Sequence, residues 1–220
     1  MPALLDQNIF TQTNLDSAAL TILGSVLHRF SEPGAYRGVA LRNGQAEATF
    51  TLRVDPDCAA SQVNIDLATL GQTGQSGCGG GSGPVFTIHP KGYAIFHVSQ
   101  GAGGYAVHLG MASAEGPGPK AFDSRLLKAG DIFTATLLRP GTYRVTNAAN
   151  KTHAAIVMSY PVRGKTAYRP GPAVSVECTS EGFAPKEIRL TPAQGQVFHC
   201  KTAAHLKVDL VKADDGPKRS

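Results

Sequence analysis

Hydrophobic and polar residues alternate strictly over residues 46–54, and this is the clearest pattern in the chain. The residues at even positions from Ala46 to Val54 are apolar, and those between them are polar or charged. A period of two predicts a strand with one buried and one solvated face. Arg42-Asn43-Gly44-Gln45 precedes it and predicts a hairpin turn, because Asn-Gly accepts positive φ at low cost.

Shorter patterns of the same kind recur along the rest of the chain. Gly, Pro, Asn and Asp separate them, which is typical of turns between strands. We expect Gly101 to Gly104 to close a hairpin between two of these strands. The expected strands cover residues 63–67, 85–89, 93–99, 105–109, 131–138, 142–147, 154–160, 174–178, 187–190, 196–201 and 206–211.

Residues 14–29 have a mixed pattern. Asp16 is a suitable helix N-cap, and Leu20, Leu23 and Leu27 recur at helical spacing, which predicts one short N-terminal helix. The β-branched residues of the same segment favour a strand instead, so the strand stays open as the alternative.

A five-residue motif occurs twice. Pro33-Gly34-Ala35-Tyr36-Arg37 returns 107 positions later as Pro140-Gly141-Thr142-Tyr143-Arg144, and each copy precedes strand-like sequence. Pro presets φ, Gly permits a tight bend, and the Tyr ring can cover the core while its hydroxyl reaches a polar partner. The repeat suggests two related β-units in one chain.

Composition agrees with an all-β protein. The 220 residues include 25 Gly and 14 Pro, and only 17% are charged. Many turns and short strands follow from such a composition. Pattern and composition together divide the chain into an N-terminal arm (1–14), a first β-unit (15–70), a Gly/Ser linker or loop (71–84), a second β-unit (85–162), a linker (163–172), a small C-terminal β-unit (173–213) and a tail (214–220).

Charge and hydropathy exclude some classes of protein. Residues 163–220 carry +4 of the net charge of +5, but without the dense basic patch and interleaved aromatics of a nucleic-acid interface. The longest apolar stretch near the start, Ala18 to Val26, is far shorter than the roughly 20 residues of a membrane span. The first residues lack the basic and apolar regions of a signal peptide, so the compartment is left open.

Four cysteines are present, at positions 58, 78, 178 and 200. Their spacing fits no zinc motif, since no Cys-x-x-Cys pair occurs. Two disulfides, Cys58–Cys78 and Cys178–Cys200, and four free thiols are both open.

The residues that could bind a metal are His89, His97, His108 and Met111. If the hairpin around Gly101 to Gly104 pairs His97 with Ala106, then His97 and His108 lie on the same sheet face as diagonal neighbours. Two such histidines, with His89 from the next strand and Met111 as a soft axial ligand, could bind copper or zinc. Ordinary strand histidines are the simpler interpretation.

No pattern points to catalysis. A Gly-x-Ser-x-Gly nucleophile elbow is absent from the sequence, and His199 and Cys200 alternate to opposite faces of their strand. The aspartates, among them Asp123 and Asp131, read as turn or strand-edge residues at the surface. We therefore expect that the protein is not an enzyme.

Two segments resemble the cupredoxin family. Residues 138–147, Leu-Arg-Pro-Gly-Thr-Tyr-Arg-Val-Thr-Asn, are similar to the closing hairpin of cupredoxins, and residues 182–188, Gly-Phe-Ala-Pro-Lys-Glu-Ile, with residues 195–197 and His205, resemble the strand that leads to that family's first copper histidine. The resemblance covers residues 84–162 and part of 173–212. It implies Greek-key β-sandwich units.

The sequence departs from the cupredoxin pattern at the family's copper site. Asn147 stands where the copper cysteine is expected, and His153 could replace only the later histidine. Without a thiolate a blue-copper site cannot form. We therefore expect a non-enzymatic structural or assembly subunit that acts through protein–protein surfaces and self-associates. The alternative is a cupredoxin-like metal-binding protein in copper handling or electron transfer.

Overall fold

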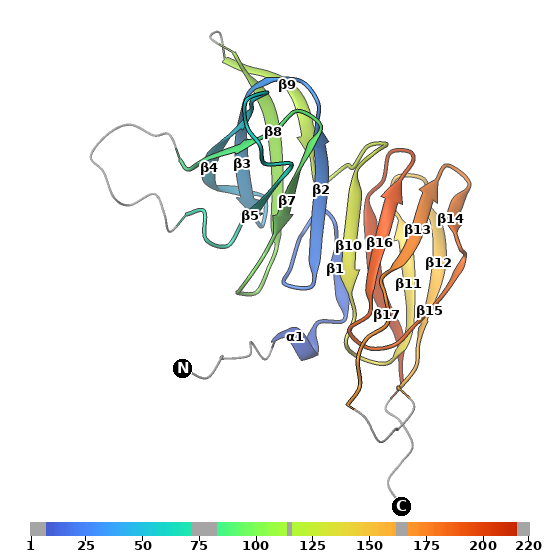
Figure 1. The fold of residues 1–220 in the computed structure, drawn as a ribbon. Helices are drawn as coiled ribbons and strands as arrows, with labels where there is room; N and C mark the ends of the chain where they lie inside the picture. The colour runs from blue at the N-terminus through green and yellow to red at the C-terminus, as the bar shows by residue number, and fades with distance from the viewer. Residues whose placement is uncertain (1–7, 72–82, 114–115, 162–166, 215–220) are drawn as a thin grey trace, which may run out of the picture.

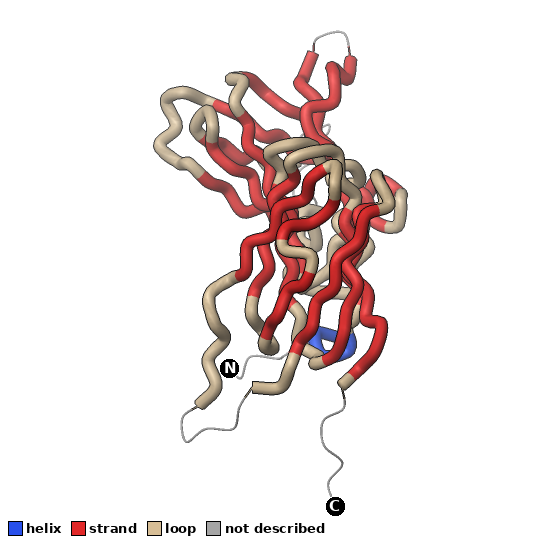
Figure 2. The backbone as a smooth tube through the Cα atoms, turned by 90° about the vertical axis from the view of Figure 1, so that its right-hand side faces the viewer, coloured by secondary structure: helices blue, strands red, loops and turns tan. Residues whose placement is uncertain are grey.

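The computed structural model describes residues 8–71, 83–113, 116–161 and 167–214. It is an all-β protein, as the sequence predicts, and these ranges contain three sheets and a single helical turn, α1 (Asn8–Thr11) (Figures 1 and 2). Residues 14–29 form no helix, so that prediction is wrong. They form β1 (Asn14–Asp16) and β2 (Gly24–Phe30) because their apolar side chains are buried by pairing with strands far along the chain.

The largest sheet has seven strands and is called sheet C. It runs through both halves of the molecule, in the order β14-β13-β16-β10-β2-β7-β5 (Figure 1). Its strands other than β2 are β5 (Gln62–Asp66), β7 (Gly92–His97), β10 (Ile132–Thr136), β13 (Val174–Thr179), β14 (Gly182–Ala184) and β16 (Gly195–Cys200).

Two five-stranded sheets complete the molecule. Sheet B has the order β6-β4-β3-β8-β9, and sheet A has the order β1-β17-β11-β12-β15. Sheet B consists of β3 (Gly34–Arg42), β4 (Gln45–Val54), β6 (Val85–Ile88), β8 (Tyr105–Ser113) and β9 (Gly116–Asp123). Sheet A adds to β1 the strands β11 (Gly141–Asn147), β12 (Thr152–Met158), β15 (Glu187–Leu190) and β17 (Leu206–Ala213).

The two halves repeat one pairing scheme. Antiparallel β3 and β4 correspond to β11 and β12, the parallel pair β4 and β6 corresponds to β12 and β15, and the antiparallel pair β3 and β8 corresponds to β11 and β17. In sheet C, β2, β7 and β5 correspond in the same way to β10, β16 and β13. The duplication suggested by the repeated motif is thus present in the pattern of strand pairs.

An approximate two-fold axis relates the halves. The corresponding strands β2 and β10 are antiparallel neighbours, and Val26 is paired with Phe133, 107 positions later. Both side chains are fully buried, so they point to the same face of sheet C. Sheets A and B therefore cover one face of sheet C side by side.

Each half lends one strand to the other. β1, which leads into the first half, pairs with β17 of the second, and β9, which leads into the second half, pairs with β8 of the first. Corresponding residues repeat this junction: the backbone N–H of Leu206 donates to Ser17 Oγ, and that of Val107 donates to Ser124 Oγ. The sheets do not divide at the linker expected at 71–84. The strands β6, β7 and β8, which follow it, pair with strands of the first unit. The strands β13 to β17 complete the sheets that contain β10 to β12.

The repeated Pro-Gly-x-Tyr-Arg motif opens β3 and β11. Gly34 and Gly141 have φ of 146° and 152°, and each following Tyr is buried. Tyr36 Oη donates to the carbonyl of Glu32 at 2.7 Å, and Tyr143 Oη donates to that of Arg139 at 2.6 Å. Burial raises the pKa of both phenols. The predicted use of the ring and the hydroxyl is confirmed in both copies.

Candidate functional site

The structure separates two of the predicted metal ligands. His97 ends β7 in sheet C, whereas His108 and Met111 lie in β8 of sheet B. The predicted hairpin between these strands is wrong: residues 98–104 cross from one sheet to the other, and Leu41, rather than His97, is paired with Ala106. His97 and His108 therefore do not share a sheet face.

The remaining predicted ligands are also apart. His89 follows β6 at the edge of sheet B, exposed, with Nδ1 2.7 Å from the carbonyl oxygen of Pro90. His108 and Met111 stand three positions apart in β8, a spacing that alternates to opposite faces of a strand. Burial lowers the pKa of His108, which favours its neutral form. Within the described ranges no three His, Cys, Asp or Glu side chains are grouped as a metal site; copper binding stays a prediction.

The strongest candidate site is the outer face of sheet C, the face opposite sheets A and B. Leu27 is paired with both Ile95 and Ile132, and Val197 in β16 is paired with Thr134, the next residue of β10 on the same face as Ile132. All four apolar side chains are half-buried, so each keeps part of its surface in contact with solvent. Beside them, Ser25 Oγ and Thr134 Oγ1 are hydrogen-bonded at 2.5 Å across the β2–β10 junction.

Two histidine–carboxylate pairs flank this apolar centre at corresponding positions. His97 is paired with Asp66 in β5, and His199 is paired with Glu177 in β13. Burial raises the pKa of Asp66, but hydrogen bonds from Ser99 and Ala68 and the nearby His97 outweigh burial and lower it. Glu177 is 3.2 Å from Lys201 Nζ. Sequence reasoning placed His199 and Cys200 on opposite faces, as observed, but gave His199 no role.

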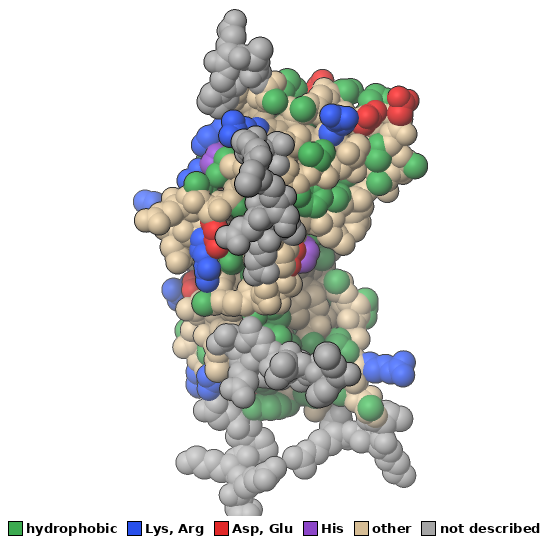
Figure 3. Space-filling model, turned by 90° about the vertical axis from the view of Figure 1, so that its left-hand side faces the viewer, with side chains coloured by type: hydrophobic (Ala, Val, Ile, Leu, Met, Phe, Trp, Pro, Cys, Tyr) green, Lys and Arg blue, Asp and Glu red, His purple; other side chains and the backbone are tan. Residues whose placement is uncertain are grey.

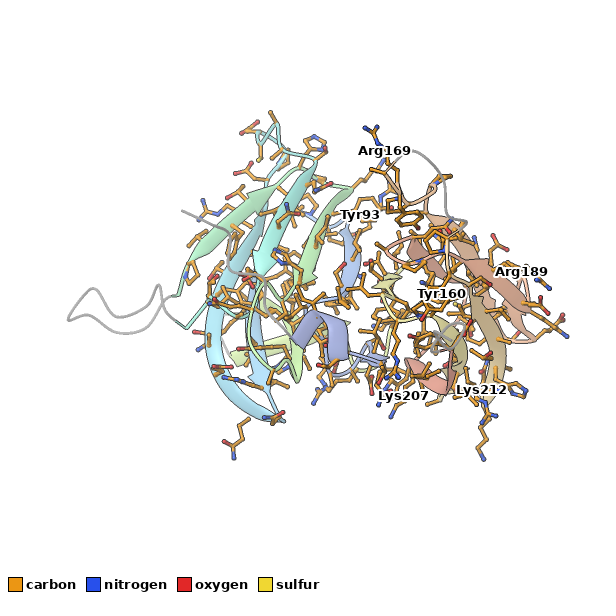
Figure 4. The ribbon with its side chains drawn as sticks, turned by 90° about the horizontal axis from the view of Figure 1, so that it is seen from below. Tyr93, Tyr160, Arg169, Arg189, Lys207 and Lys212 are labelled. Atoms are coloured by element: carbon orange, nitrogen blue, oxygen red, sulfur yellow. The ribbon has the colours of Figure 1, made fainter. Side chains whose placement is uncertain are left out.

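Aromatic and basic side chains extend the outer face of sheet C at one end. Tyr93 is paired with Arg29, and the Arg29 Nε–H donates to the carbonyl of Lys91 at 3.0 Å. Figure 4 shows Tyr93 on one side of the molecule and Lys207 and Lys212 of sheet A on the opposite side. This face thus combines an apolar centre with charges of both signs at its margins.

A polar pair between half-buried His28 and buried Asp131 joins the two halves on the covered face of sheet C. His28 Nδ1 lies 2.5 Å from Asp131 Oδ1, and the other carboxylate oxygen accepts the backbone N–H of Lys128. The His28 ring packs against Phe30 and Phe122. Asp131 is only 2% exposed, so its expected place at the surface is wrong. Its partner lies 103 positions away, and no local pattern could have revealed it.

A shallow hollow lies at one end of the first half. Arg42, Glu47, Gln100 and Tyr105 line it, with the Arg42 guanidinium 5.3 Å from the centre of the Tyr105 ring. Arg42 also forms an exposed ion pair of 3.5 Å with Glu47. Such exposed pairs hold their groups weakly, and the hollow offers a less organised surface than the outer face of sheet C.

Comparison of the chain with protein-family models, with curated proteins and with solved structures gives no match in any of the three. In the part of the chain that the structure describes, no helix is long and apolar enough to cross a membrane. Figure 3 shows a side of the molecule on which small groups of hydrophobic side chains alternate with polar ones.

Proposed function

We propose that the protein is a non-enzymatic structural or assembly subunit that self-associates through the outer face of sheet C. The observation that carries the proposal is the apolar centre of that face, formed by Leu27, Ile95, Ile132 and Val197. A sheet with one face covered normally presents polar side chains on the other. Apolar side chains that gather on an outer face, rimmed by polar residues, mark interaction surfaces.

A second copy of the chain is the partner that this face fits. It carries Arg29 at one margin and the carboxylates of Asp66 and Glu177 at others, so two copies facing one another can bring opposite charges together. Contacts between identical faces about a two-fold axis need this self-complementarity. The half-buried aliphatic centre would supply the apolar contact, and the charged margins would set the orientation.

We further infer that each half is a Greek-key β-sandwich. Rings of the two layers meet in the first half, where Phe50 of sheet B lies 6.2 Å from Phe96 of sheet C, and Phe122 stacks on Phe96 at 5.3 Å. Most pairs are antiparallel and join strands that are distant in sequence, rather than the parallel neighbours of a solenoid. The resemblance to cupredoxins agrees with this inference and stays a prediction.

Sedimentation velocity over a range of concentrations tests the function. We expect a reversible dimer or larger species, and we expect Ile95→Glu and Val197→Glu, at corresponding positions of the two halves, each to shift it to monomer. Leu126→Glu is the matched control, because Leu126 is 50% exposed between β9 and β10, outside this face. A chain that is monomeric at every concentration, or one whose association survives both variants, would contradict the proposal.

A further inference from the structure

Two cysteines face each other inside the second half. Cys178 in β13 and Cys200 in β16 are directly opposite in a parallel strand pair, and each is 1% exposed. Neighbouring strands lie about 4.8 Å apart, which is within the range of Cα separations that a disulfide spans, about 4.4–6.8 Å. Both side chains enter the core from the same face of sheet C, so their Cβ atoms point the same way.

The two thiols already interact in the reduced state. Both cysteines are free here. A hydrogen bond with the Cys178 side chain is the main cause that raises the pKa of Cys200, and burial of the thiol is the second. The backbone fixes the same register, since the N–H of Lys201 donates to the carbonyl of Cys178 at 2.8 Å. A bond between the sulfurs would therefore require little movement of either strand.

The first half provides an internal comparison. Its strands β5 and β7 correspond to β13 and β16, and continuing their register past Asp66 and His97 places Leu67 opposite Val98 where the second half has Cys178 and Cys200. Leu67 and Val98 are each 2% exposed. An aliphatic pair therefore fills this position of the fold, and the second half has two thiols there instead.

The geometry points to a disulfide between Cys178 and Cys200 as an oxidised form of this protein. The co-reactant is a low-molecular-weight disulfide, such as oxidised glutathione. The thiolate of one cysteine attacks a sulfur of that disulfide, breaks its S–S bond and releases one thiol. The thiolate of the other cysteine then attacks the mixed disulfide, forms the Cys178–Cys200 bond and releases the second thiol. The two cysteines are oxidised, the small disulfide is reduced to two thiols, and the two protons end on those thiols.

The burial of Cys178 and Cys200 in the folded protein determines at which stage the disulfide can form. The attacking species is a thiolate, and the raised pKa of the buried Cys200 thiol leaves little of that species at neutral pH, while the core shields both cysteines from the reagent. We therefore expect slow oxidation of the folded protein and efficient oxidation during folding, before β13 and β16 are covered. Once formed, the bond is shielded from reductants by the same burial.

Refolding of the full chain with oxidised and reduced glutathione tests the inference. Trypsin cleaves after Lys186 and Arg189, between the two cysteines, so a disulfide is detected as a linked pair of peptides that reduction separates. The closed segment of about 20 residues should raise the midpoint of thermal unfolding by roughly 6–12 °C relative to the reduced protein.

The matched variant takes its residues from the first half: Cys178→Leu with Cys200→Val. It should fold, lose the linked peptides and lose the redox-dependent shift of the midpoint, while Cys58→Ser should keep both. Absence of the Cys178–Cys200 peptides after oxidative refolding, or an equal redox shift in the Leu/Val variant, would overturn the inference.

Discussion

At the scale of single residues, corresponding aspartates close the two exchanged strands. Asp16 ends β1 and Asp123 ends β9, and each accepts a hydrogen bond from the backbone N–H two residues ahead, Ala18 and Arg125. Asp16 also contacts His205, just before β17, at 2.8 Å and Lys207 of β17, its partner strand, at 3.3 Å. Asp123 is instead held by Arg125 and Lys120, near its own strand. One turn is thus kept in both halves with different cationic partners.

Replacing Asp123 with Asn should lower stability in a pH-dependent way. Burial raises the pKa of Asp123, but its hydrogen bonds with Arg125 and Lys120 outweigh burial and hold it at about 2. A carboxyl whose pKa is lower in the folded than in the unfolded state stabilises the fold above pH ~4, and this contribution is lost as the pH falls to about 2. We expect Asp123→Asn to cost on the order of 1–2 kcal/mol at pH 7, after allowance for partial exposure.

Urea unfolding of both proteins between pH 7 and pH 2 measures this difference. The gap in the free energy of unfolding should narrow below pH 4 and close near pH 2. A gap of constant size down to pH 2 would show that the charge of Asp123 does not contribute.

At the scale of elements, a three-residue strand near the N-terminus contributes a residue to the hydrophobic core. β1 has only three residues, yet Leu15 is 2% exposed and belongs to the hydrophobic core, paired with Val208 near the other end of the chain. Terminal segments usually contribute little to stability unless they are tied to the fold in this way. β1 is such a tie, because it forms the edge of sheet A.

Leu15→Ala should therefore destabilise the protein by about 2–4 kcal/mol, because it removes a fully buried side chain and leaves a cavity. Chemical denaturation measures the loss. Leu126→Ala, at a half-exposed position, is the control and should change stability by less than about 0.5 kcal/mol. A similarly small effect at Leu15 would mean that β1 is not part of the cooperative fold.

Local pattern predicted the elements where one strand carries a complete signal. The alternation over 46–54 and the Asn43-Gly44 turn became β4 and its hairpin, with φ of 51° and 84° at the turn. The local pattern gave a wrong prediction where pairing with a distant strand determines the structure. Leu20, Leu23 and Leu27 have helical spacing, but Leu20 is bridged to Tyr105 and Leu27 is paired in sheet C, so long-range pairing outweighs the local periodicity. The prediction that His97 and His108 share one sheet face was wrong for the same reason, because their strands pair in different sheets.

At the scale of the whole molecule, the halves are joined too closely to behave as independent domains. Sheet C is continuous through β2 and β10, and β1 and β9 each complete a sheet of the opposite half. The repeated motif could reveal duplication from sequence because it is local. The exchange could not be predicted, because pairs such as Asn14 with Asp209 leave no trace in neighbouring residues.

Separate expression of residues 1–113 and 116–220 tests this coupling. The first fragment lacks β9 and loses Phe122 from its core, and the second lacks β1 and the β2 neighbour of β10. We expect neither fragment alone to show a cooperative unfolding transition, and a mixture of the two to regain the circular dichroism of the intact chain. A sharp unfolding transition in either isolated fragment would contradict this coupling of the two halves. Two resolved transitions in calorimetry of the full chain would contradict it as well.

The exchange of β1 also has a consequence for the order of events during synthesis. Of the described strands, β1 is synthesised first and its partner β17 last. Domains normally fold in sequence as they emerge, but here β1 has no partner in sheet A until β17 has been synthesised. In the newly made chain the apolar Leu15 side chain and the unpaired edge of β8 are exposed to other chains. They are covered only after β9 and then β17 have been synthesised. Slow translation between β1 and β17 should therefore lengthen the period in which this protein can aggregate.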